Sequence, residues 1–275
     1  MTMISRIEQA VSFIRERADL VPDVGLVLGS GLGVLADEVE GEQIAYADIP
    51  GFPDSTAPSH KGTLHVGTLA GRKVVAMQGR VHLYEGYQPS EVAFPMRVMA
   101  GLGAKQAILT NAAGGLDPSI EVGDLVAIED HLSMANLAGA DPLRGPNDDR
   151  IGPRFVSMNG AYDKGLIAAA ESVADSEGIT LKKGVYAFVT GPSFETPAEV
   201  RLLQTLNCHV VGMSTVPEVI AARHHGLQVL AISAVTNTAV SSVQDTHVTN
   251  VEEVWDATKA IQPRLKSLVR GLLSQ

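Results

Sequence analysis

Short apolar runs alternate along the chain with longer segments whose apolar residues recur at helical spacing. The apolar runs predict buried strands at residues 24–28, 74–77, 107–109, 125–128, 185–189, 209–212 and 229–235. The helical spacing predicts helices at residues 4–19, 90–102, 159–177, 196–206, 215–225 and 251–273. Strands that alternate with helices are typical of an α/β fold with a largely parallel sheet.

Two of the predicted helices begin with the same arrangement of side chains. A Thr stands three residues before a Glu in both Thr196-Pro197-Ala198-Glu199 and Thr215-Val216-Pro217-Glu218. This spacing predicts a capping box, in which the Thr and Glu side chains bond backbone N–H groups of the first turn. The Pro close to the start supports both helices. The helix at residues 90–102 is expected to begin with a Ser90 cap.

No linker or change of composition divides the chain, so we expect one domain over residues 1–275. Residues 137–154 differ from the rest because they are rich in Pro, Gly, Asp and Arg. A long polar loop in a compact domain usually serves a binding site or an interface.

Composition narrows the classes of partner and compartment. The chain is 45% hydrophobic with a formal net charge of −10, which disfavours nucleic acid or an anionic membrane as the main partner. The single Cys208 excludes an intrachain disulfide framework and suits a reducing cytoplasm. The first residues lack an apolar signal core, and no apolar run approaches the roughly 18 residues of a membrane span. We therefore expect a soluble cytoplasmic protein, and the net charge does not exclude a small anionic substrate, because a pocket sets its own local field.

Small or polar residues follow six of the predicted strands. They begin at Gly29, Gln78, Thr110, Gly191, Gly212 and Thr236. Ligands of α/β sheets bind at the carboxyl ends of strands, so these six segments are expected to line one site.

Several side chains in these segments suit an anion. The glycine-rich loop from Gly29 to Gly33 is either an anion site built from backbone N–H groups or a tight turn. Arg80 carries a planar donor fork that matches phosphate oxygens. Arg80, His82 and Tyr84 alternate, so in an extended segment they would face one side and favour a site there.

Other segments leave two interpretations open or favour a flat ligand. His60 lies in a loop and is either part of the site or exposed and idle, and Ser214 is either a helix cap or a hydroxyl aimed at an anion. The bend at Gly191-Pro192 brings Phe194 and Glu195 together, an aromatic face beside an acceptor that suits a flat heterocycle. No set of residues has the spacing of a metal site, and no nucleophile elbow is present.

Taken in order, the motifs resemble those of the trimeric class of purine nucleoside phosphorylases. The resemblance runs from about Val24 to Trp255. It rests on Gly29-Ser30-Gly31-Leu32-Gly33, Gly79-Arg80-Val81-His82-Leu83-Tyr84-Glu85-Gly86-Tyr87, Thr110-Asn111-Ala112-Ala113-Gly114-Gly115, Leu143-Arg144-Gly145-Pro146-Asn147-Asp148, Gly191-Pro192-Ser193-Phe194-Glu195-Thr196 and Gly212-Met213-Ser214-Thr215-Val216-Pro217-Glu218.

The resemblance implies one α/β domain around a mixed, partly barrel-like sheet flanked by helices. The reaction it implies is the phosphorolysis of purine (deoxy)ribonucleosides to the free base and (deoxy)ribose 1-phosphate. Inorganic phosphate is then a co-substrate, and neither a cofactor nor a metal is expected.

Site residues carried over from the family fall into three groups, with catalytic roles for His82, Glu195 and Asn237. Phosphate would be held by Ser30, His60, Arg80, His82, the Ala112 backbone and Ser214. The sugar would be lined by Tyr84, Met213 and Tyr186, with His82 nearby. The base would be bound by Phe194, Glu195 and Asn237. Phe155 matches an aromatic residue that the family lends to a neighbour's sugar site across the interface of a homotrimer.

The base contacts implied by the resemblance carry both specificity and catalysis. Asn237 would donate to N7 and Glu195 would accept from N1–H, and both bonds strengthen as the departing base gains negative charge. The pair favours the 6-oxopurines hypoxanthine and guanine over adenine. The branch of the superfamily that prefers adenine has Asp where this chain has Asn237.

One position departs from the family. Val251 stands where a His usually contacts the 5′-hydroxyl, and His247 is a possible substitute. A more apolar 5′ pocket makes a phosphorylase for 5′-methylthio nucleosides the alternative within enzymes. A purine-binding regulator without turnover, and a scaffold whose loops contact only proteins, are the alternatives outside them.

Overall fold

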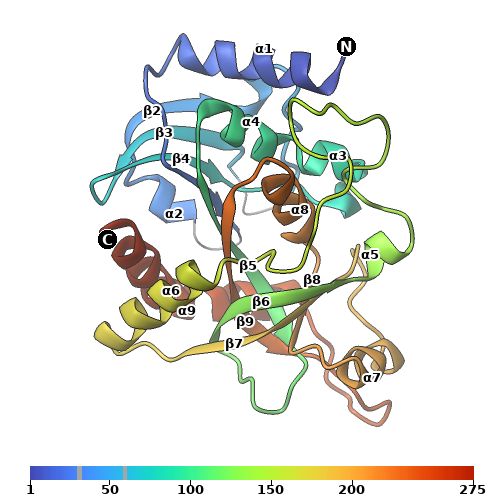
Figure 1. The fold of residues 1–275 in the computed structure, drawn as a ribbon. Helices are drawn as coiled ribbons and strands as arrows, with labels where there is room; N and C mark the ends of the chain where they lie inside the picture. Colours follow the sequence, from blue (N-terminus) through green and yellow to red (C-terminus); the bar gives the residue numbers. More distant parts are fainter. Residues whose placement is uncertain (30–32, 58–60) are drawn as a thin grey trace.

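The computed structural model describes residues 1–29, 33–57 and 61–275. Within these residues, nine strands form one sheet in the order β2-β3-β4-β1-β5-β8-β7-β6-β9, and β9 also pairs with β5 (Figure 1). The strands are β1 (Val24–Leu28), β2 (Glu40–Ala45), β3 (Thr63–Leu69), β4 (Arg72–Gln78), β5 (Gln106–Gly115), β6 (Leu125–Ser133), β7 (Leu181–Phe188), β8 (Val210–Gly212) and β9 (Gln228–Thr238).

The sheet is mixed and closes partly on itself. The parallel pairs are β1–β4, β1–β5 and β5–β9 at the centre of the sheet, and β6–β7 and β7–β8. The antiparallel pairs are β2–β3, β3–β4, β5–β8 and β6–β9. Because β9 pairs with β5 on one side and with β6 on the other, the second half of the sheet curls into a partial barrel. The predicted fold class is confirmed.

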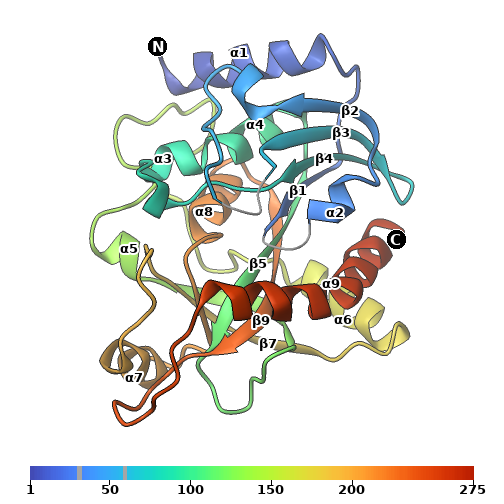
Figure 2. The same ribbon diagram turned by 180° about the vertical axis from the view of Figure 1, so that it is seen from behind.

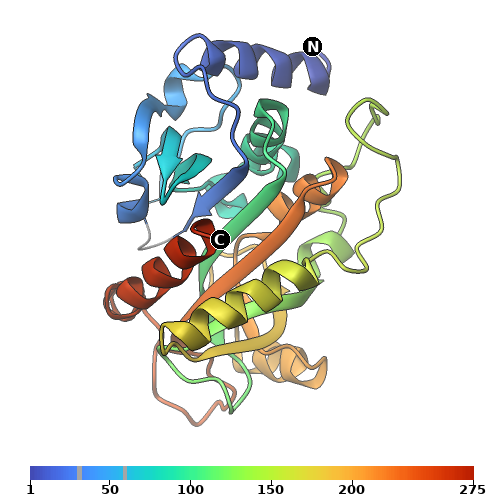
Figure 3. The ribbon, with the colours of Figure 1, turned by 60° about the vertical axis from the view of Figure 1, so that its left-hand side comes forward.

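Helices cover both sides of this sheet. They are α1 (Met3–Arg15), α2 (Gly33–Ala36), α3 (Pro89–Val92), α4 (Phe94–Leu102), α5 (Met134–Leu137), α6 (Lys164–Ser176), α7 (Pro197–Thr205), α8 (Val216–His224) and α9 (Val251–Leu273), with short 3-10 turns η1 (Tyr46–Asp48) and η2 (Leu83–Glu85). Helices α6 and α9 pack against each other and over β9, whereas α1 packs on α4 at the other end of the molecule (Figure 3).

Strand boundaries differ from the sequence prediction where the chain is polar. The edge strand β2 buries only Ile44, and β3 alternates Leu64 and Val66 with polar or small residues, so neither forms an apolar run. Strands β5 and β9 continue beyond their apolar runs through Gly115 and Thr238. The polar residues that begin at Thr110 and Thr236 therefore belong to strands, where ladder bonds satisfy their backbone groups.

Helix starts were predicted with mixed success. The Thr196 capping box is present, since Thr196 Oγ1 accepts from the Glu199 N–H at 3.3 Å and the Glu199 carboxylate accepts from the Thr196 N–H at 2.8 Å. The box predicted at Thr215 is wrong. Its Glu218 carboxylate instead lies 3.0 Å from the Arg80 guanidinium, because a buried cation needs a charged partner. The Ser90 cap is also wrong, since Gln88 caps α3 and shares a capping box with Glu91.

Candidate active site

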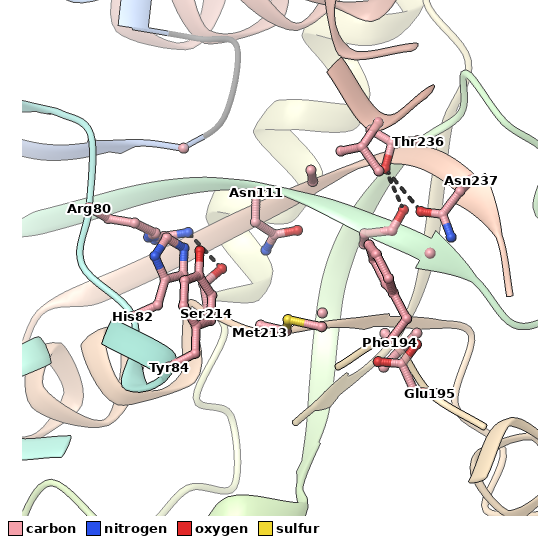
Figure 4. A pocket seen from close by; sticks show the side chains of 17 residues that line it. Arg80, His82, Tyr84, Asn111, Phe194, Glu195, Met213, Ser214, Thr236 and Asn237 are labelled. Atoms are coloured by element: carbon pink, nitrogen blue, oxygen red, sulfur yellow. Dashed lines mark hydrogen bonds between the residues drawn. The ribbon is translucent and has the colours of Figure 1, made fainter. Parts of the chain in front are cut away.

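One pocket lies where the six predicted segments meet, at the carboxyl ends of the central strands. It brings together nine of the predicted site residues: Arg80, His82, Tyr84, Ala112, Phe194, Glu195, Met213, Ser214 and Asn237. Figure 4 shows Arg80, His82, Tyr84 and Ser214 at one end and Phe194, Glu195 and Asn237 at the other, with Met213 and Asn111 between them. The predicted Ser30 and His60 lie outside the described residues.

Arg80 lies at one end of the pocket (Figure 4). Its side chain is almost fully buried, with its Nε 3.0 Å from a Glu218 oxygen. Its Nη1 donates toward the Thr110 carbonyl and the Ser214 hydroxyl, both at 3.0 Å. These contacts hold the guanidinium plane in one orientation, as recognition of a phosphate requires.

The start of α8 contributes to the same end. Thr215 has a φ of 78°, which is rare for a β-branched residue and costs about 1–3 kcal/mol. Its buried hydroxyl accepts from Arg80 at 3.1 Å and from the Asn111 amide at 2.8 Å. The conformation places Ser214 at the positive end of the helix dipole, where an anion is stabilised.

His82 and Tyr84 form one wall beside Arg80. Their rings stack with centroids 4.6 Å apart and planes at 12°. The Glu85 carboxylate accepts from the His82 backbone N–H at 2.7 Å and lies 3.0 Å from the ring Nδ1. Although burial opposes it, hydrogen bonds from His82 and Thr56 lower the pKa of Glu85 to about 2, so the carboxylate stays ionised and fixes the His82 ring.

The expectation that Arg80, His82 and Tyr84 lie in an extended segment is wrong beyond His82. Residues Leu83–Glu85 form the 3-10 turn η2. The turn still points Tyr84 into the pocket, because it folds that ring back onto His82. The alternation of Arg80, His82 and Tyr84 therefore correctly indicated that the three side chains share a site, but it did not predict the 3-10 turn that brings Tyr84 there.

The other end of the pocket presents an acceptor and a donor beside an aromatic ring. Thr236 Oγ1 donates to Asn237 Oδ1 at 3.2 Å, which leaves the Asn237 Nδ2 group as a donor. Burial raises the pKa of Glu195, whose side chain is half-buried in the same wall. Gly114 lies so close that a Cβ there would stand 3.2 Å from Asn237 Nδ2. The end therefore suits a planar ring with one N–H donor and one nitrogen acceptor.

Several residues that line the pocket were not predicted site residues, among them Asn111 and Val254. Asn111 Nδ2 donates to Thr215, and its buried Oδ1 has no partner among the described residues. Val254, in the first turn of α9, also lines the pocket. Asn111 lies within a quoted motif, which was a usable signal, whereas Val254 is an ordinary helical residue.

In the described part of the chain, Tyr186, predicted to line the sugar, and Phe155, predicted to reach a neighbour's sugar site, are both absent from the lining of this pocket. Tyr186 is fully buried behind the pocket wall, where its hydroxyl accepts from the Ser214 N–H at 3.3 Å. It positions the backbone of Ser214. Phe155 is 88% exposed on the loop that precedes α6.

No cluster of three or more His, Cys, Asp or Glu side chains in the described part of the chain is arranged to hold a metal ion. Among the same residues, none of the helices combines the length and hydropathy needed to cross a membrane.

Comparison with known proteins places this pocket in a family. Residues 23–274 match the family model described as "Phosphorylase superfamily". Purine nucleoside phosphorylase 1 of Bacillus subtilis is 48% identical over 274 residues, covering 99% of each chain. The crystal structure of Schistosoma mansoni purine nucleoside phosphorylase in complex with adenosine matches with a TM-score of 0.95 and 42% identity, covering 100% of this chain and 99% of the other. The Schistosoma mansoni structure in complex with inosine matches with a TM-score of 0.95 and 40% identity, covering 100% of this chain and 98% of the other. The chain therefore belongs to the phosphorylase superfamily and, within it, to the purine nucleoside phosphorylase family.

Proposed function

We infer that the protein catalyses the reversible phosphorolysis of purine nucleosides, releasing the base and forming (deoxy)ribose 1-phosphate. The observation that carries the proposal is the division of one pocket into an anion end at Arg80 and Ser214 and a base end at Glu195 and Asn237. The sugar of a nucleoside would lie between them, beside Met213. Phosphate is the co-substrate, and the reaction uses no cofactor or metal.

In the proposed mechanism, phosphate approaches the anomeric carbon from the Arg80 end. Arg80 and the Ser214 hydroxyl hold the phosphate, helped by Ser30, His60, His82 and the Ala112 backbone. The glycosidic bond breaks as the sugar becomes oxocarbenium-like, and the bonding electrons pass into the purine. The bound phosphate stabilises the sugar cation, its oxygen then bonds to the anomeric carbon, and the proton of the hydrogen phosphate passes to the departing base, which leaves as the neutral purine.

Stabilisation of the departing base falls to Asn237 and Glu195. Asn237 Nδ2 donates to N7, and Glu195 accepts from N1–H of a 6-oxopurine. Both hydrogen bonds are stronger to the anionic base than to the bound nucleoside, so they lower the barrier. Thr236 supports this role because it fixes the orientation of the Asn237 amide.

The substrate preference follows from Glu195. An adenine ring has no N1–H to donate to a carboxylate, so inosine and guanosine are preferred to adenosine. The related Schistosoma mansoni enzyme has been crystallised with inosine and with adenosine, so the preference has to be tested with several nucleosides, adenosine included.

The test is base release from inosine, guanosine and adenosine, each with and without inorganic phosphate. We expect phosphate-dependent release from the first two, with adenosine slower by at least tenfold, the cost of one lost hydrogen bond to a charged group. Release that does not require phosphate, or none at all, would overturn the proposal. Binding of hypoxanthine without any turnover would point to a purine-binding regulator.

A phosphorylase for 5′-methylthio nucleosides is the second candidate. Among the described residues, the pocket lining includes Val254 but neither Val251 nor His247. His247 Nε2 instead lies 3.3 Å from the Glu253 carboxylate. An apolar 5′ wall would accept a methylthio group, so 5′-methylthioinosine belongs in the substrate panel, and a kcat/KM above that of inosine would favour this candidate.

Assembly and location complete the proposal. The protein acts as a homotrimer in which Phe155 reaches a neighbour's sugar site, and the exposure of this large apolar side chain supports an interface there. The single Cys208 suits the reducing cytoplasm. Sedimentation of the purified protein tests the trimer.

A further inference from the structure

Gln78 is a buried side chain at the end of β4, two residues before Arg80. Its Nε2 group donates to the Gly33 carbonyl at 2.7 Å and to Asp37 Oδ1 at 2.9 Å. Both partners belong to α2 or its exit, and Figure 2 shows this short helix beside β1 and β4. The amide nitrogen therefore ties the start of α2 to the end of β4.

The other half of the Gln78 amide binds β3. Its Oε1 accepts from Thr63 Oγ1 and lies in hydrogen-bond distance of His65 Nε2, both at 2.9 Å. A glutamine amide has two donor hydrogens and two acceptor lone pairs, so all four positions are used. Such a saturated buried amide specifies a single arrangement of its neighbours.

Further contacts close the network on its outer side. Lys61 Nζ lies 3.0 Å from Asp37 Oδ1, and the Gly62 N–H donates to the Gln78 carbonyl at 3.1 Å. The Gln78 side chain thus holds α2, and the Gln78 carbonyl holds the residues just before β3, against the strand pair β3–β4.

The three tied segments are sequence neighbours of the proposed phosphate ligands. Gly33 ends the glycine-rich motif that contains Ser30, Lys61 directly follows His60, and Gln78 precedes Arg80 by two residues. A residue needed only to fill this space could be apolar, because the hydrogen bonds of a buried amide largely offset the cost of taking it out of water.

We propose that Gln78, with Asp37, is a positioning residue for phosphate. It sets the affinity for phosphate by keeping the segments around Gly33, Lys61 and Gln78 in one fixed arrangement. The proposal rests on the proposed function, since it takes phosphate as the co-substrate. Gln78 does not touch phosphate, and the base end of the pocket lies outside its network. Loss of the Gln78 amide should therefore raise KM for phosphate but not KM for the nucleoside.

The test compares the wild-type protein with Gln78→Leu, which removes all four hydrogen bonds, and with Asp37→Ala, which removes one of these four together with the Lys61–Asp37 ion pair. Asp37 has a side chain 45% exposed, so the second variant folds even where the first does not. For Gln78→Leu, we expect KM for phosphate to rise about tenfold, and KM for inosine to change less than about twofold. For Asp37→Ala, the rise in KM for phosphate should be about threefold.

A matched control is Leu102→Ala, which opens a cavity in the buried face of α4, a helix that contains none of the network residues. It should lower the thermal midpoint and leave the ratio of the two KM values unchanged. Equal rises of both KM values in the Gln78 and Asp37 variants, or no rise, would refute the positioning role.

Calorimetry with inorganic phosphate alone separates this inference from the proposed function. If the wild-type protein binds phosphate but releases no base, the proposed function fails, whereas weaker binding by both variants still supports the positioning role. Wild-type affinity in both variants, or no binding of phosphate by the wild-type protein, overturns it.

Discussion

At the scale of single residues, the pocket depends on the protonation of one carboxyl group. Burial raises the pKa of Glu195, and the ionised form accepts a much stronger hydrogen bond from N1–H than the neutral form does. As the pH falls through this raised pKa, the charged acceptor is replaced by a weaker neutral one, so kcat/KM for inosine should decline at a pH above the ordinary range of glutamate. The profile is measured at saturating phosphate. In Glu195→Gln, we expect activity to fall by about 100-fold at neutral pH and the decline assigned to Glu195 to disappear. An identical decline in the variant would assign it to another group.

A second residue-scale prediction concerns the space beside Asn237. In Gly114→Ala, the added Cβ would stand 3.2 Å from Asn237 Nδ2 and 3.4 Å from Val211 Cγ1, so the amide must move. We expect kcat/KM to fall by about tenfold, because a displaced donor loses much of its bond to N7. In an Asn237→Ala background the same substitution should have almost no effect on kcat/KM. Additive losses in the double variant would show that Gly114 acts elsewhere.

At the scale of elements, the start of α8 combines backbone strain with hydrogen bonding. In Thr215→Val the shape and the positive φ remain, but the hydroxyl that accepts from Arg80 and Asn111 is lost. We expect KM for phosphate to rise about tenfold and the free energy of unfolding to fall by about 1–3 kcal/mol. The matched Thr215→Ser variant keeps the hydroxyl and should bind phosphate almost as the wild-type protein does. Equal behaviour of the two variants in phosphate binding would exclude the hydroxyl as the cause.

The elements also show what local sequence can reveal. Strand β1 and helix α9 have the predicted boundaries, because β1 is an uninterrupted apolar run and α9 carries a long amphipathic stripe. The Thr196 box was also predicted, because its partners are three residues apart. The same pattern at Thr215 failed, since a distant Arg80 competes for Glu218. Parallel strands bring their carboxyl ends together, which made most of the pocket predictable, whereas Val254 enters it only through the packing of α9 on β9.

At the scale of the whole molecule, the exposed Phe155 makes the assembly testable through shared sites. In Phe155→Ala we expect kcat/KM for inosine to fall about tenfold, since burial of a Phe side chain is worth about 1.5–3 kcal/mol. Asn237→Ala should be almost inactive for a different reason, because its own base site lacks the N7 donor. When the two variants are co-expressed, a Phe155→Ala subunit that receives Phe155 from an Asn237→Ala neighbour has a complete site. Random mixing makes about a quarter of all sites complete, so activity should rise about fivefold above that of the two variants mixed after separate purification. Activity that equals the average of the separate variants would mean that Phe155 serves its own subunit or no site at all.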